Sequence, residues 1–482
     1  MRKFSHRLCR VLVLFAGCLA AASSHAADRS PETAALIKRG EYVATASDCA
    51  ACHTAAQGKP FAGGLPLVSP LGTIYSTNIT PSKDFGIGRY TEEQFSQAIR
   101  HGIRSDGANL YPAMPYTSYS IFTDADVHAL YTYFMLGVMP VDVAAPETKL
   151  PFPLNIRASL QVWNLLFLNK NSFQSDPHQS AEWNRGRYLV QGAAHCSVCH
   201  TPRGFMMQEE AGLELSGGQV GTWYAPNITS DAASGIGSWT REELVDYLRT
   251  GRLRGKAQAA GDMGEAVEHS FQYLSAEDLE AIATYVKSVP PVHDSRDDTS
   301  RFTVGKMSSD LATLRGADGI RSDNDANPTG AELFQGNCAS CHSAQGQGSK
   351  DGYYPSLFHN SASGAVNANN LIATILYGVD RTTSKGQAYM PGFGGKPTDS
   401  TALSDQEITL LGNYVLAHYG RAIVSITAQD VAQVRSGGPK SSLVELARAG
   451  IASGVVILIV ILAFLIVRGR TRAIRSGPRS LP

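Results

Sequence analysis

The sequence has no excess of charge of either sign, since its 482 residues include 42 lysines and arginines and 42 aspartates and glutamates. It also has no long run of like charges, so it gives no sign of a nucleic-acid partner or of a solvated charged tail. The glycine fingerprint of dinucleotide-binding domains, the nucleophile elbow of hydrolases and the zinc-protease helix are absent from the sequence as well. The chemistry of the chain must therefore come from other residues.

The first residues have the three parts of an export signal. The first ten residues include several basic ones, an uncharged apolar stretch covers 11–22, and Ser24-His25-Ala26 supplies the small-x-small cleavage pattern. The apolar stretch is too short to cross a bilayer comfortably. The sequence therefore predicts a signal peptide over 1–26. Phe15-Ala16-Gly17-Cys18 also resembles a lipoprotein cleavage site, so lipidation of Cys18 remains an alternative.

The other end of the chain predicts a single membrane-spanning helix. Residues 449–467 carry no charge, and as a helix they would measure about 28 Å, close to the thickness of the bilayer core. The tail 468–482 contains arginines and no acidic residue. Because positive segments stay on the cytoplasmic side, the bulk of the chain is expected to be periplasmic and anchored in the cytoplasmic membrane. Residues 421–448 are then a juxtamembrane segment.

Cysteine usage indicates covalently attached haem. The chain has eight cysteines, two of them in the predicted signal. In an exported protein, paired cysteines are most often disulfides, and half a zinc site or a redox dithiol is the next alternative. Here a histidine follows each pair directly, as in haem c attachment, where two thioethers hold the porphyrin and the imidazole binds iron. The three motifs, which predict three haems c, are Cys49/Cys52/His53, Cys196/Cys199/His200 and Cys338/Cys341/His342.

The chain repeats itself around these motifs, which is typical of an array of similar units. Arg39-Gly40-Glu41-Tyr42 recurs as Arg185-Gly186-Arg187-Tyr188, and Asn78-Ile79-Thr80 recurs as Asn227-Ile228-Thr229. Each unit is expected to end in an amphipathic helix that starts at a Ser/Thr-x-x-acid cap, at Thr123, Ser275 and Ser404. The repeats predict domains over 33–140, 184–290 and 326–420.

Two connectors separate the predicted domains. Residues 141–183 are rich in proline and apolar residues, so they are expected either to pack between domains or to form a docking surface for a partner or a quinone. Residues 291–325 are polar and predict a solvated linker.

A methionine recurs at one fixed distance in each repeat. A glycine that ends a helix-like segment is followed after 12 residues by methionine, from Gly102 to Met114, from Gly251 to Met263 and from Gly378 to Met390. Most methionines are core residues, but three in one register predict the sixth ligand of each iron, because thioether sulfur suits haem iron.

These residues closely resemble the three-haem cytochrome c subunit of bacterial membrane-bound dehydrogenases for alcohol, aldehyde, gluconate, fructose and sorbitol. The resemblance covers nearly the whole mature chain and is most specific at 78–91, 111–116, 261–274 and 403–419. It implies a mainly α fold with three tandem class I-like cytochrome c domains and a C-terminal transmembrane helix. The clear spanning helix is a departure, since some members end in a shorter tail.

The resemblance also implies partners and contacts. A separate large subunit with pyrroloquinoline quinone, flavin or molybdopterin would oxidise the substrate, and this chain would pass the electrons to ubiquinone. The family ligands correspond to the three cysteine pairs, His53, His200 and His342, and Met114, Met263 and Met390. A glycine early in each unit (Gly40, Gly186, Gly330) would let the first helix cross the last one closely. Pro66 and Pro355 would offer carbonyls to the axial histidines, whereas Leu213 stands at the matching place in the second repeat.

Two other functions are consistent with the sequence. A free-standing relay to a terminal oxidase would need no dehydrogenase subunit. A haem peroxidase would need an open axial position, for which the second haem is the best candidate because its proline is missing. Neither reading changes the haem-binding residues.

Overall fold

The computed structural model describes residues 30–308 and 328–475, apart from 398 and 400. Helices dominate this part of the chain, and its strands form separate two-stranded antiparallel hairpins. The prediction of a mainly α protein is confirmed. The predicted signal peptide 1–26, residues 309–325 of the predicted linker and residues 476–482 of the basic tail lie outside the described residues.

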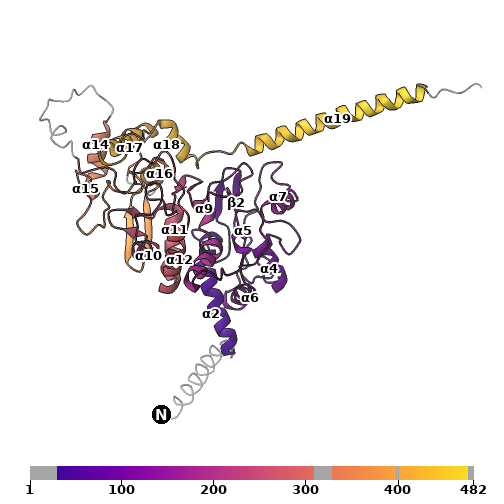
Figure 1. Cartoon of the computed structure of the whole chain (residues 1–482), viewed down its shortest axis with the longest axis horizontal. Coiled ribbons are helices and arrows are strands. Elements are labelled where there is room, and N and C mark those ends of the chain that lie inside the picture. Colours follow the sequence, from indigo (N-terminus) through magenta and orange to yellow (C-terminus); the bar gives the residue numbers. More distant parts are fainter. Residues whose placement is uncertain (1–29, 309–327, 398, 400, 476–482) are drawn as a thin grey trace, which may run out of the picture.

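The elements follow the predicted repeats in chain order. The first repeat contains α2 (Pro31–Ala46), α3 (Cys49–His53), β1 (Pro66–Ser69), β2 (Gly72–Tyr75), α4 (Glu92–His101), α5 (Tyr116–Tyr119), α6 (Asp124–Thr132) and the π-helical turn η1 (Tyr133–Gly137). The first connector contains α7 (Ser159–Phe167). Figure 1 shows these helices gathered on one side of the body.

In Figure 1 the second repeat lies beside the first, and the helices of the third repeat lie above α10 at the upper left of the body. The second contains α8 (Ala181–Tyr188), η2 (Leu189–Ala193), α9 (Ser197–His200), β3 (Gly218–Val220), β4 (Trp223–Ala225), α10 (Arg241–Thr250), β5 (Arg252–Leu253), β6 (Ala257–Gln258), α11 (Gly261–His269), η3 (Phe271–Tyr273) and α12 (Ala276–Ser288). The third contains α14 (Gly330–Asn337), α15 (Ala339–His342), α16 (Asn369–Tyr377), β7 (Val379–Thr383), β8 (Gly386–Met390) and α17 (Asp405–Tyr419), followed by α18 (Ala428–Arg435) and α19 (Leu443–Arg475).

The closing helices α6, α12 and α17 begin at the predicted caps. The side chains of Thr123, Ser275 and Ser404 each accept a hydrogen bond from the backbone N–H three residues later. Such caps stabilise a helix because its first N–H groups have no partner within the helix. The apolar residues expected on one face are all buried: Val127, Leu130, Leu279, Ile282, Ile408 and Leu411.

A glycine allows the first helix of each repeat to touch the backbone of the closing helix. A Cβ atom at these glycines would lie 2.0, 1.9 and 2.4 Å from a carbonyl oxygen of the closing helix. No real side chain fits at such distances. The pairs are Gly40 with Ala129, Gly186 with Ala281 and Gly330 with Leu410. The crossing expected from the resemblance is therefore confirmed.

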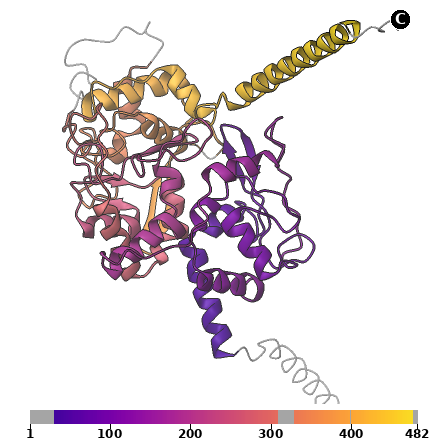
Figure 2. The same cartoon turned by 45° about the vertical axis from the view of Figure 1, so that its right-hand side comes forward.

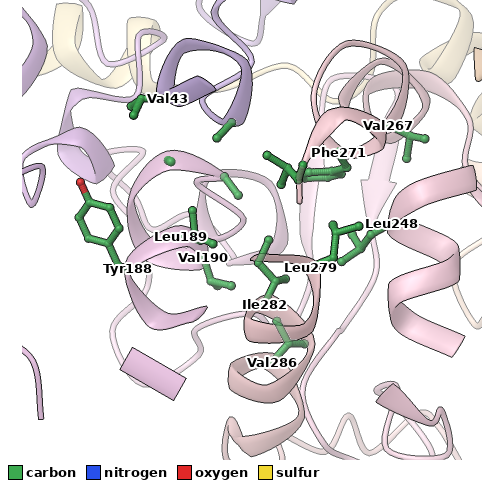
Figure 3. Close-up of a cluster of buried hydrophobic side chains, with 14 of the residues drawn as sticks. Val43, Tyr188, Leu189, Val190, Leu248, Val267, Phe271, Leu279, Ile282 and Val286 are labelled. Carbon is green, nitrogen blue, oxygen red and sulfur yellow. The ribbon is translucent and has the colours of Figure 1, made fainter. Parts of the chain in front are cut away.

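The first two repeats share one hydrophobic core, whereas the third has its own. Figure 3 shows Val43 of α2 in the same cluster as Leu189 and Val190 of η2 and Leu279 and Ile282 of α12. Figure 2 shows the third repeat beside the other two and α19 leaving the body. The described structure is thus a closely joined pair of repeats with a third repeat packed against it.

A reciprocal hydrogen-bond pattern joins the first two repeats, and we call it the reciprocal Tyr–Asp contact. Tyr42 of α2 donates its hydroxyl to Asp278 of α12 at 2.6 Å, and Tyr188 of α8 donates to Asp126 of α6 at 2.6 Å. Each aspartate also accepts from an arginine of its own repeat, with Arg39 Nε at 3.0 Å and Arg185 Nε at 2.7 Å. The repeated Arg-Gly-x-Tyr sequence and the helix caps therefore fix the two repeats relative to each other.

Replacing Asp278 by asparagine is expected to lower the free energy of unfolding by about 2 kcal/mol at pH 7, because hydrogen bonds from charged and phenolic groups to the carboxylate are lost. Burial acts to raise the pKa of Asp278, but the bonds from Arg185 and Tyr42 outweigh it and the pKa is lowered. The contribution is therefore complete above the unfolded pKa of about 4 and is lost as the pH falls further. Urea unfolding of both forms at pH 7 and at acidic pH measures this.

The matched control is Asp84→Asn, because Asp84 pairs with Arg89 in an exposed ion pair. Exposed pairs contribute about 0–1 kcal/mol, so this control should leave stability nearly unchanged. If Asp278→Asn behaved like Asp84→Asn at both pH values, the reciprocal Tyr–Asp contact would not stabilise the pair of repeats.

The recurring Asn-Ile-Thr segments have a structural role. Asn78 and Asn227 are buried, and each accepts from the backbone N–H of the threonine two residues later, at 2.9 Å in both cases. The amide of Asn78 donates to the carbonyl of Val141, and that of Asn227 donates to the carbonyl of Val292. These asparagines hold the chain segments that follow α6 and α12.

The second connector differs from its prediction. Residues 291–308 are not a solvated linker, because Arg301 and Phe302 are buried and Arg301 donates to the carbonyls of Ser234 and Asn227. Backbone carbonyls take the place of water around the buried guanidinium of Arg301. The composition of the segment alone does not reveal this burial. In the first connector, Asn164 is buried whereas neighbouring apolar residues of α7 are exposed. Helix α8 begins at Ala181, inside the predicted connector 141–183, because Ser180 caps it.

The C-terminal helix α19 is longer than the predicted span of 449–467. It begins at Leu443, within the predicted juxtamembrane segment, and continues to Arg475 in the basic tail. Residues 443–468 are long and apolar enough to cross a membrane, and none of the most apolar window is buried. One apolar C-terminal helix fits a single membrane anchor.

Candidate functional site

Each cysteine pair lies in a short helix or at its N-cap, after the first helix of its repeat. These helices are α3, α9 and α15, and each ends at the motif histidine. Cysteines three residues apart on such a turn lie on the same side of the helix. None of the six cysteines in the described part of the chain is in a disulfide. Both thiols of a pair can therefore attach to one edge of one porphyrin.

The surroundings of the thiols do not favour a redox dithiol or a zinc site. Burial raises the pKa of Cys49, Cys196 and Cys338 to about 12, so these groups are protonated at neutral pH. Disulfide exchange requires the thiolate, so these groups are poor redox dithiols. Among the described residues, no cluster of three or more His, Cys, Asp or Glu side chains could hold a metal ion. The arrangement fits haem attachment better.

The three motif histidines are oriented by backbone carbonyls. Nδ1 lies 2.6 Å from the carbonyl oxygen of Thr77 for His53, 2.7 Å from that of Pro226 for His200, and 2.9 Å from that of Pro355 for His342. A carbonyl can only accept, so Nδ1 carries the proton and the lone pair of Nε2 is free. This bond fixes the ring and raises its donor strength toward a metal.

The environment also keeps these imidazoles neutral. Burial lowers the pKa of His53 and His342, and it lowers the pKa of His200 to about 4. A neutral imidazole is the form that binds iron. All three histidines are therefore prepared as ligands in the same way.

The predicted carbonyl partner of His53 was wrong, and that of His342 is confirmed. Pro66 lies in β1, where it pairs with Tyr75 of β2, and the carbonyl comes from Thr77 just after this hairpin. In the second repeat Pro226 follows the corresponding hairpin β3–β4. The described chain from 343 to 368 has no strand, so the carbonyl there comes only 13 residues after the histidine.

This correction removes the reason to treat the second haem site as different. Leu213 has no bearing on His200, since Pro226 supplies the carbonyl. Thr77 and Pro226 each precede the Asn-Ile-Thr segment directly. That shared position was the signal in the sequence that could have identified them.

The three predicted methionine ligands follow glycines that end helices, as expected. Gly102, Gly251 and Gly378 are the C-cap residues of α4, α10 and α16. In the first two repeats the loop returns to the glycine, because Leu110 N donates to Gly102 O and Ala259 N donates to Gly251 O. In the third repeat Met390 pairs with Val379, the residue after the glycine.

The backbone around the methionines is not the same in the three repeats. Met114 lies in a turn before α5, Met263 in the first turn of α11, and Met390 at the end of β8. The spacing in the sequence predicted the position of each methionine relative to the preceding glycine, but not these different backbone conformations. All three side chains are half-buried.

Each methionine packs against the same core as a haem cysteine of its repeat. Met114 and Met263 contact the shared core of the first two repeats, as do Cys49 and Cys196. Met390 contacts the core of the third repeat, as does Cys338. The structure thus brings the predicted cysteine and methionine of every repeat to one core.

Helix α11 connects all three candidate sites. It contacts α3, which carries the cysteines of the first site, and β7, which pairs with the strand of Met390, while it carries Met263 itself. Figure 1 shows α11 between the first and third repeats. Arg381 of β7 is buried and donates to the carbonyl of Ala259, close to Met263 in the chain. The three sites are therefore neighbours in series.

Two sequence families match parts of the chain. The model of the family described as "Cytochrome c" matches residues 328–418, and that described as "Cytochrome C oxidase, cbb3-type, subunit III" matches residues 35–134. These matches cover most of the first and third repeats.

Curated relatives match most of the chain. The fructose dehydrogenase cytochrome subunit of Gluconobacter japonicus is 50% identical over 422 residues, which are 86% of each chain. The cytochrome c subunit of alcohol dehydrogenase (quinone) from Gluconacetobacter polyoxogenes is 40% identical over 85% of this chain and 86% of its own. The gluconate 2-dehydrogenase cytochrome c subunit of Pantoea cypripedii is 38% identical over 83% of this chain and 90% of its own.

Proposed function

This chain belongs to the family of cytochrome c subunits of fructose, alcohol and gluconate dehydrogenases, and we propose that it binds three haems c and passes electrons to ubiquinone. Its role as an electron-transfer subunit of a membrane dehydrogenase complex follows from the family. The number of haems, the acceptor and the periplasmic location of the three domains are our proposals. A separate subunit with pyrroloquinoline quinone, flavin or molybdopterin would oxidise the substrate.

The residues of each repeat fit one haem c. The thiols of each pair would form the thioethers, and the motif histidine would bind iron through its free Nε2. Met114, Met263 and Met390 would supply the opposite ligand. When bound, haem c supplies an iron that changes between the ferrous and ferric states. The protein would supply attachment, one histidine and one methionine ligand, and a buried environment at each site.

The contact of α11 with both α3 and β7 is the observation that best supports a relay. A carrier needs its centres close together and in series, and here one helix that carries a proposed ligand touches elements of the two other sites. The order along the chain from first to third site would then also be the order in space.

Purification in mild detergent tests the proposal. The full chain is expected to co-purify with a large dehydrogenase subunit, to contain three covalent haems per chain, and to allow substrate-dependent reduction of a ubiquinone analogue. The reduced protein should not bind carbon monoxide, because histidine and methionine would occupy both iron ligand positions of each haem. Carbon monoxide binding at all three haems would contradict a carrier role.

The alternative of a free-standing relay to a terminal oxidase has one supporting observation, the match of residues 35–134 to a cbb3-type oxidase subunit. Co-purification with an oxidase in place of a dehydrogenase would favour it. The peroxidase alternative rested on the missing proline of the second site and loses that support, since Pro226 takes the position.

Replacing Met390 by histidine should keep the third haem attached and lower its reduction potential. Imidazole favours ferric iron more than thioether does, and the expected decrease is on the order of 0.1–0.3 V, within the ~0.8 V over which axial ligands tune haem. A spectroscopic redox titration of the purified protein measures it. Met139→His is the control, since Met139 is exposed and outside the register. An unchanged titration for Met390→His would remove Met390 from the ligand set.

A further inference from the structure

Helix α7 exposes an apolar side to solvent. Leu165 is 80% exposed, Val162 60% and Leu166 59%. The nine residues of the helix contain no charged side chain. Phe152 and Ile156, which precede α7 in the connector, are also exposed. We call these five residues the α7 face.

The opposite side of α7 is firmly attached to the body. Asn164 is buried and accepts a hydrogen bond from the hydroxyl of Tyr116 at 2.8 Å. The indole of Trp163 donates to the carbonyl of Met206 at 2.9 Å. The α7 face is therefore held in place and does not arise from a poorly packed helix. An apolar surface held outward in this way marks an interaction site.

The membrane helix begins beside this face. Arg448 of α19 donates through Nε to the carbonyl of Phe152 at 2.9 Å. Arg448 is the last residue before the uncharged segment 449–467. An arginine at the end of a spanning segment lies at the interface between headgroups and acyl chains. Phe152 must therefore lie at the same depth.

The direction of α19 agrees with this placement. In Figure 1 the helix leaves the body on the side where α7 lies, while α14 to α18 lie on the other side. A bilayer crossed by α19 would approach the body from the α7 side. A helix that presents one apolar side without charged residues can bury that side at the boundary between the headgroups and the acyl chains.

We propose that the α7 face lies in the interfacial layer of the same bilayer that α19 spans, with Val162, Leu165 and Leu166 toward the acyl chains. This second membrane contact would fix the orientation of the first repeat relative to the membrane. A dehydrogenase subunit could also cover an apolar face, but nothing requires it to do so at the depth set by Arg448. The bilayer is therefore the occupant that the observations favour.

Depth measurement by spin labelling tests the proposal. A nitroxide is attached to Leu165→Cys in the full-length, haem-loaded protein, which is kept oxidised and reconstituted into phosphatidylethanolamine–phosphatidylglycerol vesicles. Ile423→Cys is the matched control, because Ile423 is 79% exposed and lies between α17 and α18 on the other side of the body. Unchanged haem content and absorption show that both variants are folded.

The ratio of collisions with oxygen to collisions with a water-soluble nickel chelate should be several times higher at position 165 than at 423, because oxygen concentrates in the acyl region. Equal ratios at the two positions would overturn the proposal. A label at 165 that becomes shielded from both reagents only when the dehydrogenase subunit is present would also overturn it, since the face would then bind protein. None of these outcomes depends on ubiquinone being the electron acceptor.

Discussion

Replacing Cys338 and Cys341 together by alanine is expected to lower the number of covalent haems per chain from the proposed three to two. Without thioethers, the third haem would be held only by His342 and Met390 and would be lost during purification under denaturing conditions. Pyridine haemochromogen absorbance per chain measures the number directly. The third repeat should also lose stability, because Cys338 packs against its hydrophobic core and the porphyrin would no longer complete that core.

Ser340→Ala is the control for this experiment. Ser340 lies between the two cysteines, so the change tests the same short helix without removing a thiol. It should leave three haems per chain. If the double cysteine variant also retained three, or if the native protein contained fewer than three, the proposed haem count would be wrong.

Replacing Gly186 by alanine is expected to prevent the close crossing of α8 and α12. The new Cβ atom would lie 1.9 Å from the carbonyl oxygen of Ala281 and 2.9 Å from Cβ of Tyr285. The oxygen belongs to a helix backbone, so it cannot move without shifting α12. A loss of about 3 kcal/mol or more in the free energy of unfolding is expected, at the upper end of overpacking effects. Urea unfolding followed by haem absorbance measures it.

Gly336→Ala is the matched control, because it places alanine in the first helix of another repeat and is expected to raise stability. Gly336 lies in helix α14, and a Cβ atom there would meet nothing within 4 Å. Alanine favours helix over glycine by about 0.5–1 kcal/mol, so this variant should be slightly more stable. A small effect of Gly186→Ala, similar in size to that of Gly336→Ala, would mean that the helices separate easily.

The sequence predicted the parts of the sites that depend on local patterns. The cysteine pairs, the histidines and the caps at Thr123, Ser275 and Ser404 are determined by residues within a few positions of one another. The glycine crossings were also predicted, because the resemblance supplied the partner helix. The ligand role of the methionines remains a prediction.

The sequence failed where a contact depends on how an inserted hairpin folds. The carbonyl for His53 comes from 24 residues away, because β1 and β2 extend the loop before the chain returns to the ring. Counting residues from the histidine could not predict the carbonyl partner, because the count does not include the added hairpin. The burial of Arg301 was missed for a related reason. The charged side chain is buried only because it donates to carbonyls that are distant in the sequence.

The reciprocal Tyr–Asp contact has the form of an isologous interface, the kind found in a twofold homodimer. Residue i of one unit meets residue j of the other, and j meets i in return. Two copies of one ancestral unit could form both bonds from a single set of residues, so duplication would produce the whole interface at once. The third repeat has neither the arginine nor the tyrosine beside Gly330, and its cap carries Glu407 in place of aspartate. It therefore could not exchange places with either member of the symmetric pair.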